Sequence, residues 1–125
     1  MFELGIVGRF EAAHRLHGDF GPATRRHGHT YRVEVRATGR QLREDGTLFD
    51  ITRLQAALDE VTASLHYRDL DEIPALAGRN TTAEVMAQFI FDSIAPRFNG
   101  LGLSRLSVRV WESPDAYASY TEDVP

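Results

Sequence analysis

The sequence contains no cysteine and no lysine. Without cysteine the chain has no disulfide, no thiolate ligand for zinc and no cysteine nucleophile. Without lysine it has neither a Schiff-base lysine nor the lysine of a phosphate-binding loop. All 14 basic residues are therefore arginine, a bias that the base composition of the source genome explains most simply.

Long hydrophobic runs are also missing. No apolar stretch approaches the roughly 18 residues that a membrane helix needs. Residues 1–4 have neither the basic start nor the apolar stretch of a signal peptide, so we expect a cytoplasmic protein. The 125 residues, 42% hydrophobic and 26% charged, predict a single globular domain over residues 1–125. The net charge of −4 argues against nucleic acid or an anionic membrane as the main partner.

The alternation of apolar and polar residues predicts four strands. The first two, residues 1–13 and 27–38, are long, and the second has one polar face. Shorter alternating segments predict strands at residues 106–110 and 117–120. Two hairpins that flank helices are typical of an α+β fold with an antiparallel sheet.

Two helices are predicted between these hairpins. Apolar residues at helical spacing follow Asp50, a good N-cap residue, and continue to about His66. Thr81 and Glu84 form a capping box that begins a second helix, which Pro96 ends. Loop compositions occupy residues 15–26, 39–46 and 67–79. The expected element order is thus β-β-α-α-β-β.

Three histidines are expected to converge at one end of the first hairpin. His27 and His29 share a strand face because residues i and i+2 project together, and His14 ends the neighbouring strand on the inward parity. Three imidazoles with a fourth, open position form a catalytic zinc site. The alternative is a set of buried histidines held by hydrogen bonds. His17 lies in the following loop, where a solvated or supporting role is the better interpretation.

Other polar residues admit two interpretations each. Glu112 continues the apolar face of its strand. It is either a carboxylate anchor for the N–H edge of a heterocycle or a strand-end residue facing water, which the strand pattern alone favours. His66 is either a helix-terminal cation or a general acid–base group. Arg25 and Arg26 either bind an anionic substrate such as a phosphate or lie in a solvated loop.

Five segments together carry a family resemblance: Phe10–His14, His27–Tyr31, Asn80–Glu84, Trp111–Ser113 and Tyr117–Tyr120. In this order the chain resembles the 6-pyruvoyltetrahydropterin and 6-carboxytetrahydropterin synthase family over nearly its whole length. The resemblance implies the T-fold, an antiparallel sheet with two helices on one face. It also implies a homohexamer of two stacked trimers, with sites at subunit interfaces.

The resemblance also implies a role for each matching side chain. It implies that zinc is bound by His14, His27 and His29. It implies that the pterin substrate is bound by Glu112, Thr82 and Glu84. Two departures concern the groups that move protons. The family commonly places a catalytic cysteine a few residues before His-Gly-His, where Ala23 or Thr24 stands here. It also pairs an aspartate with the histidine after the first helix, but Leu65 precedes His66. Thr81 stands where proline is usual.

His66 is therefore the best-placed proton-transfer residue, and Asp69 is taken with it as catalytic. Asp71, Asp19 and Glu11 are the other acidic residues that could replace the missing groups. Some members of the family replace the cysteine with glutamate and cleave the substrate side chain differently.

These features imply a zinc-dependent lyase acting on 7,8-dihydroneopterin triphosphate or a related dihydropterin. The product is either a pyruvoyl pterin, formed by loss of triphosphate, or a carboxy pterin that feeds deazapurine (queuosine) synthesis. Aldolase-like cleavage to a hydroxymethyl pterin is a third possibility. The alternatives from other classes are a pterin-binding protein that has lost catalysis and a structural domain without metal.

Overall fold

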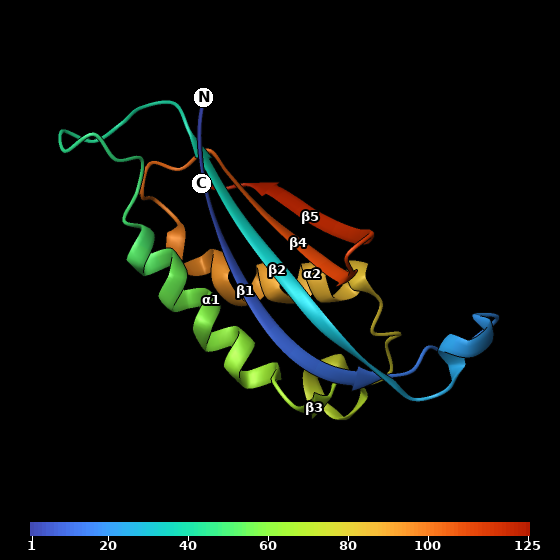
Figure 1. Cartoon of the computed structure of the whole chain (residues 1–125). Helices are drawn as coiled ribbons and strands as arrows, with labels where there is room; N and C mark the ends of the chain where they lie inside the picture. The colour runs from blue at the N-terminus through green and yellow to red at the C-terminus, as the bar shows by residue number, and fades with distance from the viewer.

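Two long strands make up much of the first third of the chain, and the rest of the fold is arranged around them. The computed structural model describes all residues, 1–125. In chain order its elements are β1 (Phe2–His14), β2 (His27–Gly39), α1 (Ile51–Leu65), β3 (Arg68–Asp69), α2 (Ala83–Ile94), β4 (Arg105–Ser113) and β5 (Ala116–Asp123), as Figure 1 shows. The strands form one five-stranded sheet in the order β3-β1-β2-β4-β5. The predicted α+β architecture is therefore confirmed.

The β1–β2 hairpin pairs over its whole length, from Phe2 opposite Gly39 to His14 opposite His27. β4 pairs with the other edge of β2, and β5 pairs with β4, both antiparallel. The structure adds one element to the predicted sheet, because β3 pairs parallel with β1 inside the segment predicted as an irregular loop. The edge of β1 offers unpaired backbone groups there, and the chain leaving α1 satisfies them.

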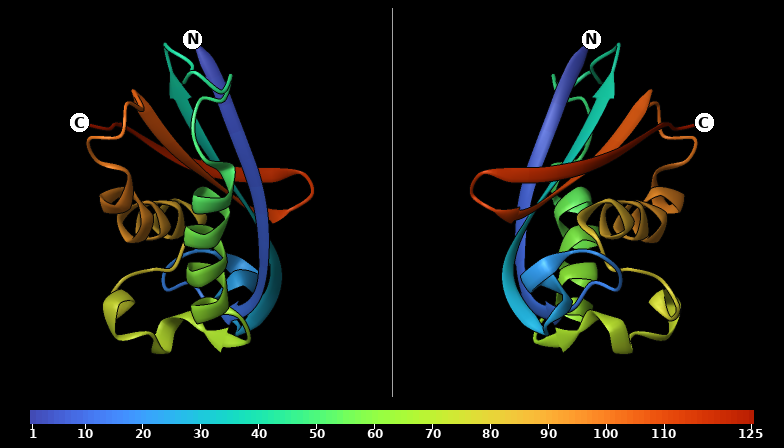
Figure 2. Two further views of the ribbon diagram at one scale, coloured as in Figure 1. Left: turned by 90° about the vertical axis from the view of Figure 1, so that its left-hand side faces the viewer. Right: turned by 90° about the vertical axis from the view of Figure 1, so that its right-hand side faces the viewer.

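Both helices cover the same face of the sheet. α1 packs against β1, and α2 packs against β4 and β5. Figure 2 shows how strongly the sheet twists, with the β4–β5 hairpin crossing the direction of β1. Neither helix is both long and apolar enough to span a membrane. The β1–β2 loop, which contains a short 3₁₀ turn at Gly21–Thr24, projects from the end of the long hairpin (Figure 1).

The core forms between the helices and the inward face of the sheet. Tyr31, Val33 and Ala37 expose none of their surface, as the predicted parity of β2 requires. Gly8 allows α1 to approach β1 closely, since a Cβ atom at this position would lie 3.0 Å from Cδ2 of Leu58. Leu58 is itself fully buried.

The start of α2 differs by one residue from the predicted capping box. Thr82, not Thr81, is the N-cap, and its hydroxyl accepts a hydrogen bond from the backbone N–H of Val85 at 3.2 Å. Thr81 is fully buried, and its hydroxyl donates to Asp71 at 2.9 Å. The Thr81 hydroxyl is therefore engaged with Asp71, and the N-cap is the next residue.

We expect Leu58→Ala to lower the free energy of unfolding by about 2–5 kcal/mol, because it leaves a cavity between α1 and β1. Leu42→Ala is the matched control, because Leu42 is 43% exposed in a loop. Its truncation should change the free energy of unfolding by less than about 0.5 kcal/mol. Urea unfolding followed by circular dichroism measures both values. Equal losses in the two variants would contradict this packing of α1 on β1.

Candidate functional site

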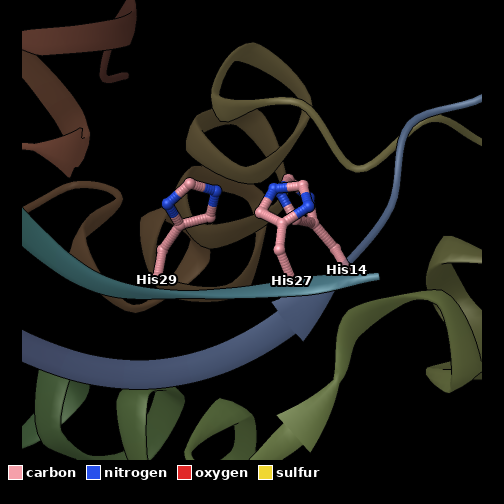
Figure 3. A group of neighbouring side chains, drawn as sticks. All are labelled: His14, His27 and His29. Carbon is pink, nitrogen blue, oxygen red and sulfur yellow. The ribbon is translucent and has the colours of Figure 1, made fainter. Parts of the chain in front are cut away.

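His14, His27 and His29 come together at the end of the β1–β2 hairpin (Figure 3). Each ring offers a nitrogen atom, and the three atoms lie within 4.8 Å of one another. The ring centroids are 4.6 Å apart for His14 and His27 and 4.7 Å apart for His27 and His29. The predicted convergence is confirmed. It arises because the last pair of the hairpin sets His14 opposite His27, and the two-residue period returns His29 to the same face.

Two of the rings are fixed by backbone carbonyls. Nδ1 of His14 donates to the carbonyl oxygen of Thr81 at 2.9 Å, and Nδ1 of His27 donates to that of Arg25 at 2.7 Å. A carbonyl can only accept, so Nδ1 carries the proton and Nε2 keeps its lone pair. Histidines that bind metals commonly show this arrangement, in which the outer hydrogen bond sets the tautomer.

The inner nitrogen of His14 is suited to a ligand. His14 is 1% exposed, yet its Nε2 atom has no hydrogen-bond partner in the protein. Such an atom is costly to bury unless something else uses its lone pair. Burial also lowers the pKa of His29, opposed by the negative charge of Glu112 and reinforced by His14 and His27. Neutral imidazole is the form that binds metals, so this set of three nitrogens fits Zn²⁺.

Tyr31 borders the histidine cluster on the side of the core. Its ring lies 5.4 Å from His29 and stacks on Phe10 at 4.7 Å. Its hydroxyl is buried without a hydrogen-bond partner in the protein. Burial raises the pKa of Tyr31, and the negative charges of Glu112 and Asp71 raise it further. The hydroxyl therefore stays protonated and is a neutral donor beside the cluster.

Glu112 approaches the cluster from β4. It is half-buried, and it lies where the pairing of β4 with β5 shifts register between Trp111 and Ser113. Its negative charge acts on both His29 and Tyr31. The structure therefore places Glu112 on the inward side of its strand, next to the histidines, and not in bulk water.

Glu84 and Glu112 share a pocket. Its volume is about 270 Å³, and its lining residues are Ala83, Glu84, Glu112, Ala116, Tyr117 and Ala118. Two of the three side chains that the resemblance assigns to pterin binding therefore lie together. The third, Thr82, does not line this pocket, and its hydroxyl caps α2.

His66 lies beside β1, at the edge of this strand that pairs with β3. Its Nδ1 atom accepts the backbone N–H of Glu11 at 3.0 Å, and its ring lies 3.7 Å from that of Tyr67. Accepting this bond leaves Nε2 as the protonated nitrogen of the neutral ring. Tyr67 has a φ of 58°, which is uncommon for a residue other than glycine. No hydrogen bond or ring contact joins His66 to the three clustered histidines.

Asp69 is held by two contacts. Its Oδ2 atom pairs with Nη1 of Arg26 at 2.7 Å, and its Oδ1 atom accepts the backbone N–H of Asp71 at 3.0 Å. Asp69 and Glu11 line a second pocket, of about 530 Å³, along the edge formed by β1 and β3. Glu11 accepts the hydroxyl of Thr30 at 3.1 Å. Glu11 and Asp69 thus line a pocket that His29 also lines, whereas Asp71 hydrogen-bonds to Thr81 beside His14.

The β1–β2 loop adds hydrogen bonds around the histidine cluster but no side chain to it. The side chain of Asn80 accepts the backbone N–H of His17 at 2.8 Å and donates to its carbonyl at 2.9 Å. The His17 ring is not part of the histidine cluster, as the loop position predicted. Asp19 is exposed, and Arg25 contributes its carbonyl to His27.

Sequence reasoning missed two neighbours of the cluster. Tyr31 shares the parity of His27 and His29 in β2, so the same alternation could have indicated its hydroxyl beside His29. Thr81 gives its carbonyl to His14 from 67 residues further along the chain, and no local pattern encodes that contact.

Comparison with known proteins agrees with the fold. The chain matches the family described as 6-pyruvoyl tetrahydropterin synthase over residues 3–123. A Pyrococcus horikoshii protein assigned as a 6-carboxy-5,6,7,8-tetrahydropterin synthase is 31% identical over 135 residues, covering 90% of this chain and 85% of its own. The 6-carboxy-5,6,7,8-tetrahydropterin synthase of Haemophilus influenzae is 29% identical over 145 residues, covering 98% of this chain and 100% of its own.

The fold has a solved counterpart as well. The structure of Caenorhabditis elegans 6-pyruvoyl tetrahydropterin synthase superposes with a TM-score of 0.83 at 24% identity, covering 97% of this chain and 95% of that one. The five-stranded sheet with two helices is thus the T-fold. The chain belongs to the 6-pyruvoyl tetrahydropterin synthase family.

The N-cap role of Thr82 gives a direct test of this region. We expect Thr82→Ala to lower the free energy of unfolding by about 0.5–2 kcal/mol, because α2 loses the acceptor for one of its free N–H groups. Thr82→Ser keeps the hydroxyl and should retain most of the stability. Urea unfolding of the two variants and the wild type measures the difference. An equal loss in Thr82→Ser would show that the methyl group, and not the cap, matters.

Proposed function

We propose that this protein is a zinc-dependent pterin lyase that acts on 7,8-dihydroneopterin triphosphate or a related dihydropterin. The observation that carries the proposal is the cluster of the buried His14 with the half-buried His27 and His29, on which Glu112 acts from β4. The match of residues 3–123 to the tetrahydropterin synthase family supports pterins as the substrate class.

Zinc would be held by His14, His27 and His29. When bound, it would polarise an oxygen of the substrate side chain and so acidify the neighbouring C–H group. Burial lowers the pKa of His29, and the carbonyls of Thr81 and Arg25 orient the rings of His14 and His27. These contacts support the proposal because they fix the lone pairs of His14 and His27 toward one point.

Glu112 would hold the pterin ring. A carboxylate accepts two N–H donors at once, and the edge of a pterin ring offers such a pair. Because Glu112 lies beside His29, a ring bound there would have its side chain near the histidines, which favours reaction by proximity. Glu84 adds a second carboxylate to the same pocket, and Thr82 supports it by starting α2.

His66 and Asp69 would transfer the proton. In the neutral ring, Nε2 of His66 carries the proton because Nδ1 accepts from Glu11. His66 lies apart from the histidine cluster within one chain. This separation is in keeping with the homohexamer implied by the family resemblance, in which sites lie at subunit interfaces and a second copy would supply His66.

A second candidate is a pterin-binding protein that has lost catalysis. The absence of cysteine and the leucine before His66 favour it. General acid–base groups contribute about 10²–10⁴-fold in rate, so their loss would leave little turnover while binding persists. The hexamer, the cytoplasmic location, the link to queuosine synthesis and the identity of the product stay predictions.

Metal binding tests the first half of the proposal. The wild type should bind about one zinc ion per chain, and His27→Ala should bind none, because two imidazoles do not complete the site. His17→Ala is the matched control, since its ring is not part of the cluster, and it should bind zinc normally. Equilibrium dialysis followed by elemental analysis measures the stoichiometry. A wild type without zinc, or His27→Ala that keeps it, would rule out this metal site.

A product assay separates the enzyme from the binding protein. Zinc-loaded protein is incubated with 7,8-dihydroneopterin triphosphate under reducing, anaerobic conditions, and products are identified by mass spectrometry. We expect a pyruvoyl, carboxy or hydroxymethyl pterin, each the mark of one reaction. Substrate that is bound but unchanged would favour the binding protein.

Equilibrium dialysis with the pterin tests the ring anchor. Glu112→Gln should weaken pterin binding by about 10- to 100-fold, because the amide loses the charge and one acceptor. Its zinc content should not change. Glu44→Gln, at an exposed loop position, is the control and should bind pterin like the wild type. Normal pterin binding by Glu112→Gln would show that another group holds the ring.

A further inference from the structure

Asp71 lies behind the histidine cluster and uses both of its carboxylate oxygens. Oδ1 accepts the hydroxyl of Thr81 at 2.9 Å, and Oδ2 accepts the backbone N–H of Arg15 at 3.0 Å. Arg15 directly follows His14, the last residue of β1, so Asp71 is joined to this histidine both through the backbone of Arg15 and through Thr81. With both oxygens engaged, Asp71 is a poor candidate for the missing base.

Thr81 passes this contact on to His14. Thr81 is fully buried, and two of its oxygens face Nδ1 of His14, the carbonyl at 2.9 Å and the hydroxyl at 3.2 Å. The single hydroxyl proton is donated to Asp71, so the lone pairs of that oxygen are free to accept from Nδ1–H. The carboxylate thus fixes the direction of the hydroxyl, and the hydroxyl and carbonyl together fix the ring.

We propose that Asp71 is a positioning residue for the metal centre, acting through Thr81 on His14. It holds the His14 ring with its proton on Nδ1, so that the buried Nε2 lone pair faces His27 and His29. A carboxylate behind the outer N–H of a ligand also raises the basicity of that ligand. This inference rests on the proposed zinc site.

The test uses the purified protein with Co²⁺ as a spectroscopic substitute for zinc. Asp71→Asn should bind Co²⁺ about 10- to 100-fold more weakly, with a shifted visible absorption band, since the amide has one acceptor where two are needed. Asp50→Asn is the matched control. Asp50 likewise accepts a backbone N–H and a hydroxyl, both from Thr52 at 3.0 and 2.6 Å, but it lies at the start of α1. The Asp50→Asn variant should have the Co²⁺ affinity and the visible spectrum of the wild type.

Variants of Thr81 separate positioning from folding. Thr81→Val keeps the carbonyl and the shape but removes the hydroxyl, so it should weaken Co²⁺ binding as Asp71→Asn does. Thr81→Ser keeps the hydroxyl, so it should bind Co²⁺ with the affinity and the visible spectrum of the wild type. If Asp71 acts through this hydroxyl, the double variant Asp71→Asn/Thr81→Val should bind Co²⁺ no more weakly than Thr81→Val alone. Additive losses would mean that Asp71 acts only by securing β1.

The outcomes distinguish this inference from the function on which it rests. A wild type that binds neither Zn²⁺ nor Co²⁺ overturns both. A wild type that binds Co²⁺ while Asp71→Asn binds it equally well, with the same spectrum, overturns the role of Asp71 alone.

Discussion

The register of the β1–β2 hairpin is the constraint on which the site depends. His14 and His27 form the last pair of a ladder that begins with Phe2 opposite Gly39. A slip of one residue would turn one strand's side chains to the other face and separate the histidines. The slip is costly because the same face buries Phe10 against Tyr31. The packing that stabilises the core therefore also aligns the candidate metal ligands.

A second constraint closes the cluster from the other side. The segment before α2 brings Asn80 to the backbone of His17 and Thr81 to the ring of His14. These contacts join the end of the long hairpin to the start of a helix more than 60 residues later. The N-cap of the helix is the next residue, Thr82. One short segment therefore both starts the helix and holds the backbone of His17 and the ring of His14.

Whether a feature could be predicted from the sequence depends on how far apart along the chain the interacting residues lie. The two-residue period of β2 predicted that His27 and His29 share a face, and parity put Glu112 in line with the apolar residues of its strand, although the strand pattern alone favoured a residue facing water. Both are local properties of a strand. The strand β3, the capping of α2 by Thr82 and the carbonyl of Thr81 on His14 depend on contacts between distant parts of the chain. The spacing of residues within one segment does not predict such contacts, so only the folded structure shows them.

The two parts of the site are under different chemical constraints. Metal binding needs three lone pairs in fixed directions, which rigid paired strands provide, and the histidines and Glu112 all lie on such strands. Proton transfer needs only a group of suitable pKa within hydrogen-bond reach of the proton, so the residue and the loop that carry it can change. The two departures that the resemblance implies for the proton-transfer groups, around residues 23–24 and 65, lie in or next to such connecting segments. Under the proposed function, the lack of cysteine leaves the three histidines and Glu112 in place. Other residues would then determine which proton is removed, and with it which bond breaks.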